Sequence, residues 1–314
     1  YIVLYWDLKN KRIGRGGYMK TSIIKRNLKT IGKTWFIFMG SIFSALSVIL
    51  SFISWEDIGI SKTCNKILGF IIIIVVTLVV AIIWICVFKQ ENTIWENGSG
   101  KIAVRYDDIM KIAFPKKYKK NKIVVIPVNT CFDTQVDEDI AKCDKPLVPP
   151  KTIHGRWIKN MIASGISKED IDSCIDEYMN FKGINPIKTL SNTEKSRGKI
   201  KCYENGTIVV LEGQNGITYF LMALSEFDEN NKAQSSKESI VECLKKLLDF
   251  YDGNGQGFEI FITLMGTGLS RSGMSHEEAL QTIKSVFQLY SDSIHGEFNI
   301  IIYHKDKGKV SIFD

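Results

Sequence analysis

A glycine-rich segment that follows an apolar run has the composition of an anion-binding loop. Residues 258–270 read FEIFITLMGTGLS, and a helix is expected to begin after Ser275. The apolar run predicts a buried strand, and the glycines let backbone N–H groups approach a ligand closely. A helix N-terminus nearby also favours an anion. We expect the loop to grip the diphosphate of a nucleotide-like ligand through Gly266, Thr267, Gly268, Leu269, Ser270 and Arg271.

A second set of polar side chains follows the buried strand predicted at residues 123–128, IVVIPV. Open α/β sheets bind ligands at the carboxyl ends of their strands, so these side chains are candidates for ribose or phosphate contact. They are Asn129, Thr130, Cys131 and Asp133. The alternative is an Asx-turn that bonds only the local backbone. Cys131 has no evident neighbouring base, so we do not expect it to be a nucleophile.

Two other positions are candidates with equally ordinary alternatives. Asp108 and Ile109 open a helix or turn after a short strand at residues 101–106. An acidic residue there complements the helix dipole, and it could be a cap and nothing more. His154 and Gly155 could form a second ligand loop, or the histidine could be buried and hydrogen-bonded.

Composition excludes several classes of protein. The chain has 314 residues, a net charge of +7, seven scattered cysteines and four histidines without metal-ligand spacing. The cysteines fit a reducing compartment, and they predict neither a disulfide framework nor a zinc site. No P-loop, GxSxG, HExxH or kinase signature is present. The basic turn at residues 115–122 suits a solvated face or a lipid contact better than nucleic acid.

Two uncharged runs at residues 35–54 and 67–88 each have the length of a membrane-spanning helix. The short loop between them predicts a transmembrane hairpin. The preceding flank holds five lysines and arginines between residues 20 and 33 and no acid, so the positive-inside rule places it in the cytoplasm. Two crossings return the rest to the same side. We expect a multi-pass protein of the inner membrane with both ends cytoplasmic.

The expected organisation has four parts: a basic segment at 1–34, the hairpin at 35–88, a polar linker at 89–100 and a domain at 101–314. Residues 1–18 precede the first methionine, Met19, and either are upstream sequence read in frame or form a native strand. In the domain, strand and helix patterns alternate around a strand pair at 206–225. This order predicts an α/β fold, a mixed sheet with helices on both faces. We expect residues 185–201 to be an exposed insertion, and residues 310–313 to extend the last strand or form an edge.

Three segments in order, IVVIPVNTCFDT, IHG and LMGTGLSRSGMSHEEALQTI, resemble a macro domain. Behind a hairpin, they are similar to the diverged macro domain of the membrane-bound effector of type II Thoeris antiphage systems. The resemblance covers about residues 101–314 in motif and 19–314 in architecture. It implies binding of ADP-ribose: Asp108 and Ile109 at the adenine amino group, Asn129 near the distal ribose, the loop at 266–271 on the diphosphate, and Tyr303 stacking on adenine.

Two departures from the family pattern favour a binder over a hydrolase. Phe132 stands where hydrolytic macro domains carry a second asparagine, and the glycine-rich first phosphate loop is missing. The resemblance further implies a partner TIR-domain enzyme that consumes NAD and makes an ADP-ribose derivative, for this type a histidine adduct. We expect no cofactor, oligomerisation on activation, membrane disruption and abortive infection. The alternatives are a membrane-tethered ADP-ribosyl hydrolase and a passive reader of ADP-ribosylated partners.

Overall fold

The computed structural model describes residues 21–314 except 141, 144–145, 192, 228–232 and 268–271. Its chain divides into two compact units, residues 1–90 with 307–313 and residues 91–306 with 314. The question of whether residues 1–18 are native lies outside the described residues. The stretch expected to be a linker instead contributes seven residues to a strand, β1 (Glu91–Asn97), because its backbone pairs antiparallel with the next strand.

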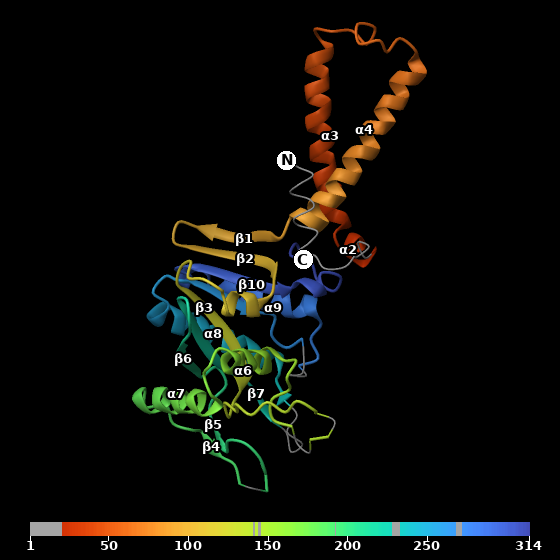
Figure 1. The fold of residues 1–314 in the computed structure, drawn as a ribbon. Helices are drawn as coiled ribbons and strands as arrows, with labels where there is room; N and C mark the ends of the chain where they lie inside the picture. Colours follow the sequence, from red (N-terminus) through yellow and green to blue (C-terminus); the bar gives the residue numbers. More distant parts are fainter. Residues whose placement is uncertain (1–20, 141, 144–145, 192, 228–232, 268–271) are drawn as a thin grey trace. The chain divides into compact units, whose positions relative to one another are not determined.

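The first unit is built on two long apolar helices, α3 (Leu28–Leu50) and α4 (Thr63–Ile83), preceded by α2 (Thr21–Arg26). A π-helical turn, η1 (Trp84–Phe88), continues α4. Figure 1 shows α3 and α4 as neighbours, and Trp35 Nε1 of α3 donates to Thr77 Oγ1 of α4 at 3.1 Å. Both helices are long and apolar enough to cross a membrane, and their outward side chains are mostly apolar. They are compatible with the predicted hairpin.

The C-terminal tail also belongs to this first unit. Residues 310–313 form neither an extension of the last strand nor an edge strand, contrary to the sequence-based expectation. Ser311 Oγ instead donates to the buried Asn27 Oδ1 at 2.6 Å, and Arg26 bonds the Lys309 carbonyl. Phe313 packs beside Ile31 in a small apolar cluster. Residues 310–313 are therefore held by the side chain of Asn27 and are not part of a strand.

The second unit is organised around a mixed sheet in the order β1-β2-β10-β9-β3-β7-β6, with β8 paired to β7. After β1 the strands are β2 (Gly100–Asp107), β3 (Lys122–Asn129), β6 (Ile208–Glu212), β7 (Ile217–Phe227), β8 (Ala233–Gln234), β9 (Glu259–Thr263) and β10 (Glu297–Tyr303). A separate antiparallel ladder joins β4 (Lys188–Thr189) to β5 (Lys201–Cys202). The predicted strand pair at 206–225 is the antiparallel pair β6 and β7.

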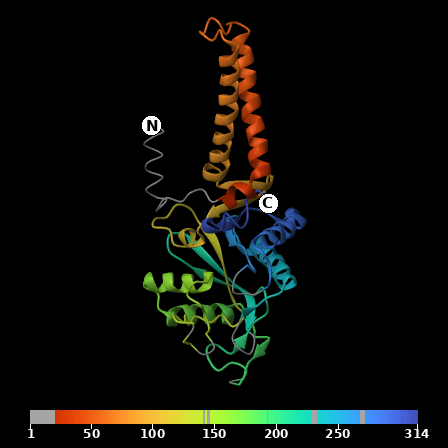
Figure 2. The same cartoon turned by 90° about the vertical axis from the view of Figure 1, so that its right-hand side faces the viewer.

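Helices cover both faces of the sheet, as the strand and helix order predicts. The helices are α5 (Ile109–Ala113), α6 (Ile153–Ala163), α7 (Lys168–Phe181), α8 (Lys237–Asn254) and α9 (His276–Leu289), with short 3-10 turns η2 (Ser291–Ser293) and η3 (His304–Asp306). Figure 2 shows α6 and α7 in green on one side and α8 and α9 in blue-green and blue on the other. Capping boxes begin α7, α8 and α9, at Ser167, Ser236 and Ser275. The predicted fold class is confirmed.

The candidate residues are gathered by the parallel part of the sheet. β10 runs parallel to β2 and β9, and β3 runs parallel to β9 and β7. Parallel neighbours have their carboxyl ends at one edge of the sheet. Asp107 and Tyr303, at the ends of β2 and β10, are partners in register. Thr263 ends β9, and Asn129 ends β3.

Candidate functional site

Arg156, which projects from α6, contacts both Asp108 and Tyr303 at the ends of β2 and β10. The Asp108 carboxylate accepts from Arg156 Nη2 at 3.0 and 3.1 Å, on Oδ1 and Oδ2. Oδ1 also accepts from the Met110 backbone N–H at 3.1 Å, which caps α5. The Arg156 guanidinium lies 5.9 Å from the centre of the Tyr303 ring. Asp108 is therefore a helix cap and one half of an ion pair, while Ile109 is buried in the core.

The loop after β3 has the form of the Asx-turn that the sequence left open. Asn129 Oδ1 accepts from the backbone N–H groups of Cys131 at 3.0 Å and Asp133 at 3.3 Å. All three side chains and that of Thr130 are buried. The Thr130 carbonyl accepts from Tyr203 N at 2.9 Å. The carbonyl end of Asn129 thus shapes the loop, and its amide nitrogen is the end that could serve a ligand.

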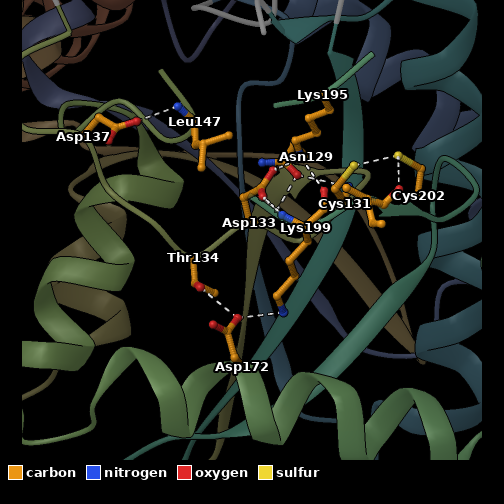
Figure 3. A network of polar contacts seen from close by, with 11 residues as sticks. Asn129, Cys131, Asp133, Thr134, Asp137, Leu147, Asp172, Lys195, Lys199 and Cys202 are labelled. Atoms are coloured by element: carbon orange, nitrogen blue, oxygen red, sulfur yellow. Dashed lines mark hydrogen bonds and ion pairs between the residues drawn. The ribbon is translucent and has the colours of Figure 1, made fainter. Parts of the chain in front are cut away.

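Asp133 is held by a lysine from the segment expected to be an exposed insertion. Its Oδ2 accepts from Lys195 Nζ at 2.6 Å, and its Oδ1 accepts from the Lys199 backbone N–H at 2.7 Å. Figure 3 shows Lys195 and Lys199 converging on this carboxylate from residues beyond β4. Both ion-pair side chains are only 1% exposed. Burial raises the pKa of Asp133, while Lys195 opposes that rise.

Lys199 extends the same network to α7. Its Nζ lies 2.7 Å from Asp172 Oδ1, which also accepts from Thr134 Oγ1 at 2.8 Å. Gly198, with φ of 81°, leaves no room for a side chain because an added Cβ would lie 2.2 Å from Asp133 Oδ1. The insertion is therefore not simply an exposed loop. It is fastened to the loop after β3 by a buried charge and a close backbone approach.

Phe132 has an unusual backbone, with φ of 52°. A bulky residue in the left-handed region is strained and needs its surroundings to hold it. Phe132 N donates to the Asn129 carbonyl at 3.0 Å, and the ring packs edge-on against Tyr203 at 5.8 Å. The side chain is 1% exposed, so it presents no polar group to a ligand.

His154 and Gly155 lie in the first turn of α6, not in a loop. Thr152 caps this helix, and its hydroxyl accepts from the Gly155 N–H at 3.0 Å. An added Cβ at Gly155 would meet the Pro149 carbonyl oxygen at 2.2 Å. His154 is buried, and burial followed by the charge of Lys199 lowers its pKa to about 3. The alternative expected a buried, hydrogen-bonded histidine, and the structure shows the burial.

The glycine-rich segment follows β9 directly. Gly266 has φ of 83°, and its carbonyl accepts from Ser272 Oγ at 2.7 Å. Thr267 is partly exposed, while Gly268, Leu269, Ser270 and Arg271 lie outside the described residues. Within the described part of the chain, the buried Thr263 hydroxyl just before this segment has no hydrogen-bond partner. There is also no group of three or more ligating side chains that could hold a metal ion among those residues.

A family model described as "Thoeris protein ThsA, Macro domain" matches residues 102–303, more than half of the chain. The chain belongs to the Thoeris ThsA macro-domain family. It is 25% identical over 283 residues to the Thoeris protein ThsA of Bacillus amyloliquefaciens (strain Y2), covering 86% of each chain. The resemblance inferred from the three sequence segments is confirmed.

Two of the solved structures similar to this chain are macrodomains. A mutant of the Oceanobacillus iheyensis macrodomain with ADPR has a TM-score of 0.43 and 12% identity, covering 71% of this chain and 94% of that one. The Trypanosoma brucei macrodomain in complex with ADP-ribose has a TM-score of 0.35 and 9% identity, covering 66% of this chain and 65% of that one.

Several residues of this macro domain escaped the sequence-based prediction. Arg156, Lys195, Lys199 and Cys202 each contact a predicted site residue or its loop. Arg156 stands beside the predicted His154, but its partner Asp108 is 48 residues away. The others lie in a polar stretch with no hydrophobic period, so no local signal could have marked them.

Proposed function

We propose that this chain is a membrane-anchored antiphage effector whose cytosolic macro domain senses an ADP-ribose-derived messenger. The observation that supports it most is the order of the candidate residues along the sheet edge. Neighbouring strands β2, β10, β9 and β3 precede or carry Asp108, Tyr303, Gly266 and Asn129 in that order. An ADP-ribose molecule presents adenine, diphosphate and distal ribose in the same order.

The spacing of the strands also suits such a ligand. Neighbouring strands lie about 4.8 Å apart, so β2 and β3, three steps apart, are separated by about 14 Å. Adenine would lie against Asp108, Ile109 and Tyr303, and the diphosphate against Gly266, Thr267 and the residues up to Arg271. The distal ribose would lie near Asn129, Thr130 and the backbone around Cys131.

Binding without hydrolysis fits the loop after β3 better. A hydrolase needs a polar group placed at the reacting ribose. The residue three positions after Asn129 is Phe132, whose ring is buried against Tyr203. Asp133, the nearest carboxylate along the loop, is already paired with Lys195 in a fully buried position. We infer a reader of the messenger and not an enzyme that consumes it.

Calorimetric titration tests the ligand. The chain should bind ADP-ribose, and the histidine adduct more tightly. Gly268→Glu adds a negative charge to the proposed diphosphate loop and should abolish binding. Gly253→Glu is the matched control, since an added Cβ at this exposed end of α8 meets nothing within 4 Å. If the protein is folded and binds neither compound, the proposed messenger is wrong. Release of free ADP-ribose from an ADP-ribosylated peptide would favour the hydrolase.

The membrane part of the proposal rests on α3 and α4 with their apolar outer surfaces. A messenger can drive assembly only if it binds the assembled state more tightly. Oligomers formed in this way would gather the hairpins, disrupt the inner membrane and end the infection. A partner TIR-domain enzyme would supply the messenger. Deleting residues 35–88 should abolish toxicity and leave ligand affinity intact, whereas toxicity that survives the deletion would refute this mechanism.

A further inference from the structure

Cys131 and Cys202 form a close thiol pair although 71 residues separate them in sequence. Their Sγ atoms lie 2.6 Å apart, and both cysteines are free thiols. Figure 3 shows the two sulfurs facing each other, one from the loop after β3 and one from β5. The backbone bond from Tyr203 N to the Thr130 carbonyl, 2.9 Å long, joins the residues beside them. The chain therefore already holds both thiols at one place.

We propose that Cys131 and Cys202 are a modification site at which a small-molecule disulfide oxidises the pair to an intramolecular disulfide. The site would fasten the end of the insertion, at β5, to the loop that carries Asn129 and Asp133. This inference rests on the position of the two thiols and does not depend on the ADP-ribose ligand. The disulfide would join covalently the two segments that the Lys195–Asp133 ion pair already holds together.

The chemistry balances with a glutathione disulfide as the oxidant. The Cys202 thiolate attacks one glutathione sulfur, forms a mixed disulfide and releases the first glutathione, which takes up a proton. The Cys131 sulfur then attacks Cys202 Sγ, loses its proton, and releases the second glutathione. Two protein thiols are oxidised by two electrons and one glutathione disulfide is reduced to two thiols. Exchange of this kind needs a thiolate and a nearby second thiol.

The electrostatics assign the order of attack. The hydrogen bond from Cys131 lowers the pKa of the Cys202 thiol to about 7, whereas that bond and burial raise the pKa of Cys131. A larger fraction of Cys202 is therefore thiolate at pH 7 than for a thiol with the ordinary pKa of 9.0. A lower pKa also reduces nucleophilicity, so the gain in attack rate is smaller than the gain in thiolate. Cys202 is partly exposed and Cys131 is buried, which also makes Cys202 the first to react.

The test uses the full chain in detergent, reduced and then incubated with glutathione disulfide. After alkylation of the remaining thiols, non-reducing digestion and mass spectrometry should find one linked peptide pair, Cys131 with Cys202. The pair should disappear on treatment with dithiothreitol. Labelling of Cys202 in the reduced protein should rise with a midpoint near pH 7, and Cys131→Ala should move that midpoint upward.

Two variants keep the result interpretable. Cys202→Ser is nearly isosteric at a partly exposed position and should leave Cys131 as a free thiol after oxidation. Cys174→Ser changes an exposed thiol elsewhere and should leave the linked pair unchanged. Circular dichroism checks that each variant is folded. The proposal is overturned if folded protein keeps Cys131 as a free thiol, or retains a glutathione adduct on Cys202, when the oxidation reaches equilibrium.

Discussion

Removing Lys195 should cost far more stability than its place in a polar insertion suggests. Its ammonium and the Asp133 carboxylate are each 1% exposed and lie 2.6 Å apart. Lys195→Met keeps the length of the side chain but leaves a buried carboxylate without its cation. Breaking one side of a buried pair costs about 3–5 kcal/mol. For a domain of this size that corresponds to a fall in melting temperature of about 10 °C.

A double-mutant cycle separates the pair from its surroundings. Asp133→Asn keeps an oxygen that can accept from the Lys199 backbone N–H, now bonded at 2.7 Å. It removes the carboxylate charge from beside the buried Lys195 ammonium, which still donates to the Lys199 carbonyl at 2.6 Å. In the double variant neither charge remains. The sum of the stability losses in the two single variants should therefore exceed the stability loss in the double variant by about 2–3 kcal/mol. This is the coupling expected for groups in direct contact.

The assay is thermal unfolding of the full chain in detergent, followed by circular dichroism. The matched control is Lys188→Met, because Lys188 belongs to the same insertion but pairs with Glu194 at the surface, with side chains 58% and 47% exposed. Surface pairs contribute little, so the control should leave the melting temperature unchanged. Two results would contradict this prediction. One is a melting temperature of Lys195→Met equal to that of the control, and the other is a stability loss in the double variant equal to the sum of the two single losses.

Three further substitutions or conditions test other parts of the site. Gly155→Ala should lower stability by about 1–3 kcal/mol because its Cβ would overlap the Pro149 carbonyl oxygen. The control in the same melting assay is Gly98→Ala, whose Cβ would extend into open space. Between pH 6.5 and about pH 5 the free energy of unfolding should fall by about 2 kcal/mol from His154 alone, because its pKa is lowered from 6.5 to about 3 and only the unfolded state takes up the proton in this range. His154→Gln should flatten this part of the pH profile of stability. Asp108→Asn keeps the helix cap but loses the carboxylate charge, and calorimetry should find ADP-ribose bound about tenfold more weakly; unchanged affinity would remove Asp108 from the adenine site.

The sheet was predictable because its strands are apolar runs and its helices have amphipathic, capped beginnings. The runs at residues 123–128 and 258–264 became β3 and β9, and Ser275 begins α9 as expected. Parallel pairing then placed the residues after these strands at one edge, a consequence of topology that the sequence order already implied. β1 was not predictable, because five of its seven residues are polar and the pairing register shifts between Thr93 and Trp95.

The partners of the candidate residues could not be predicted, since they depend on contacts between distant segments. Lys195 lies 62 residues from Asp133, and Arg156 lies 48 residues from Asp108. A lysine in a polar stretch is usually solvated, and only the folded structure reveals that this one is 1% exposed. The Asx-turn kept open for Asn129 describes its contacts, because short-range hydrogen bonding satisfies a buried polar group first. For His154 the structure shows the burial that its alternative expected.

These internal contacts limit how a ligand can be recognised at the sheet edge. A carboxylate offers about four acceptor sites, and Asp108 uses three, two for Arg156 and one for the Met110 N–H. One site on Oδ2 is left, enough for a single donor such as the adenine amino group, without release of Arg156. Asn129 can only donate to a ligand, because its side-chain oxygen already accepts from the loop and its amide nitrogen is a donor. A ligand that meets both must bring a donor to the end of β2 and acceptors to the end of β3, as the adenine amino group and the ribose hydroxyl oxygens of ADP-ribose do.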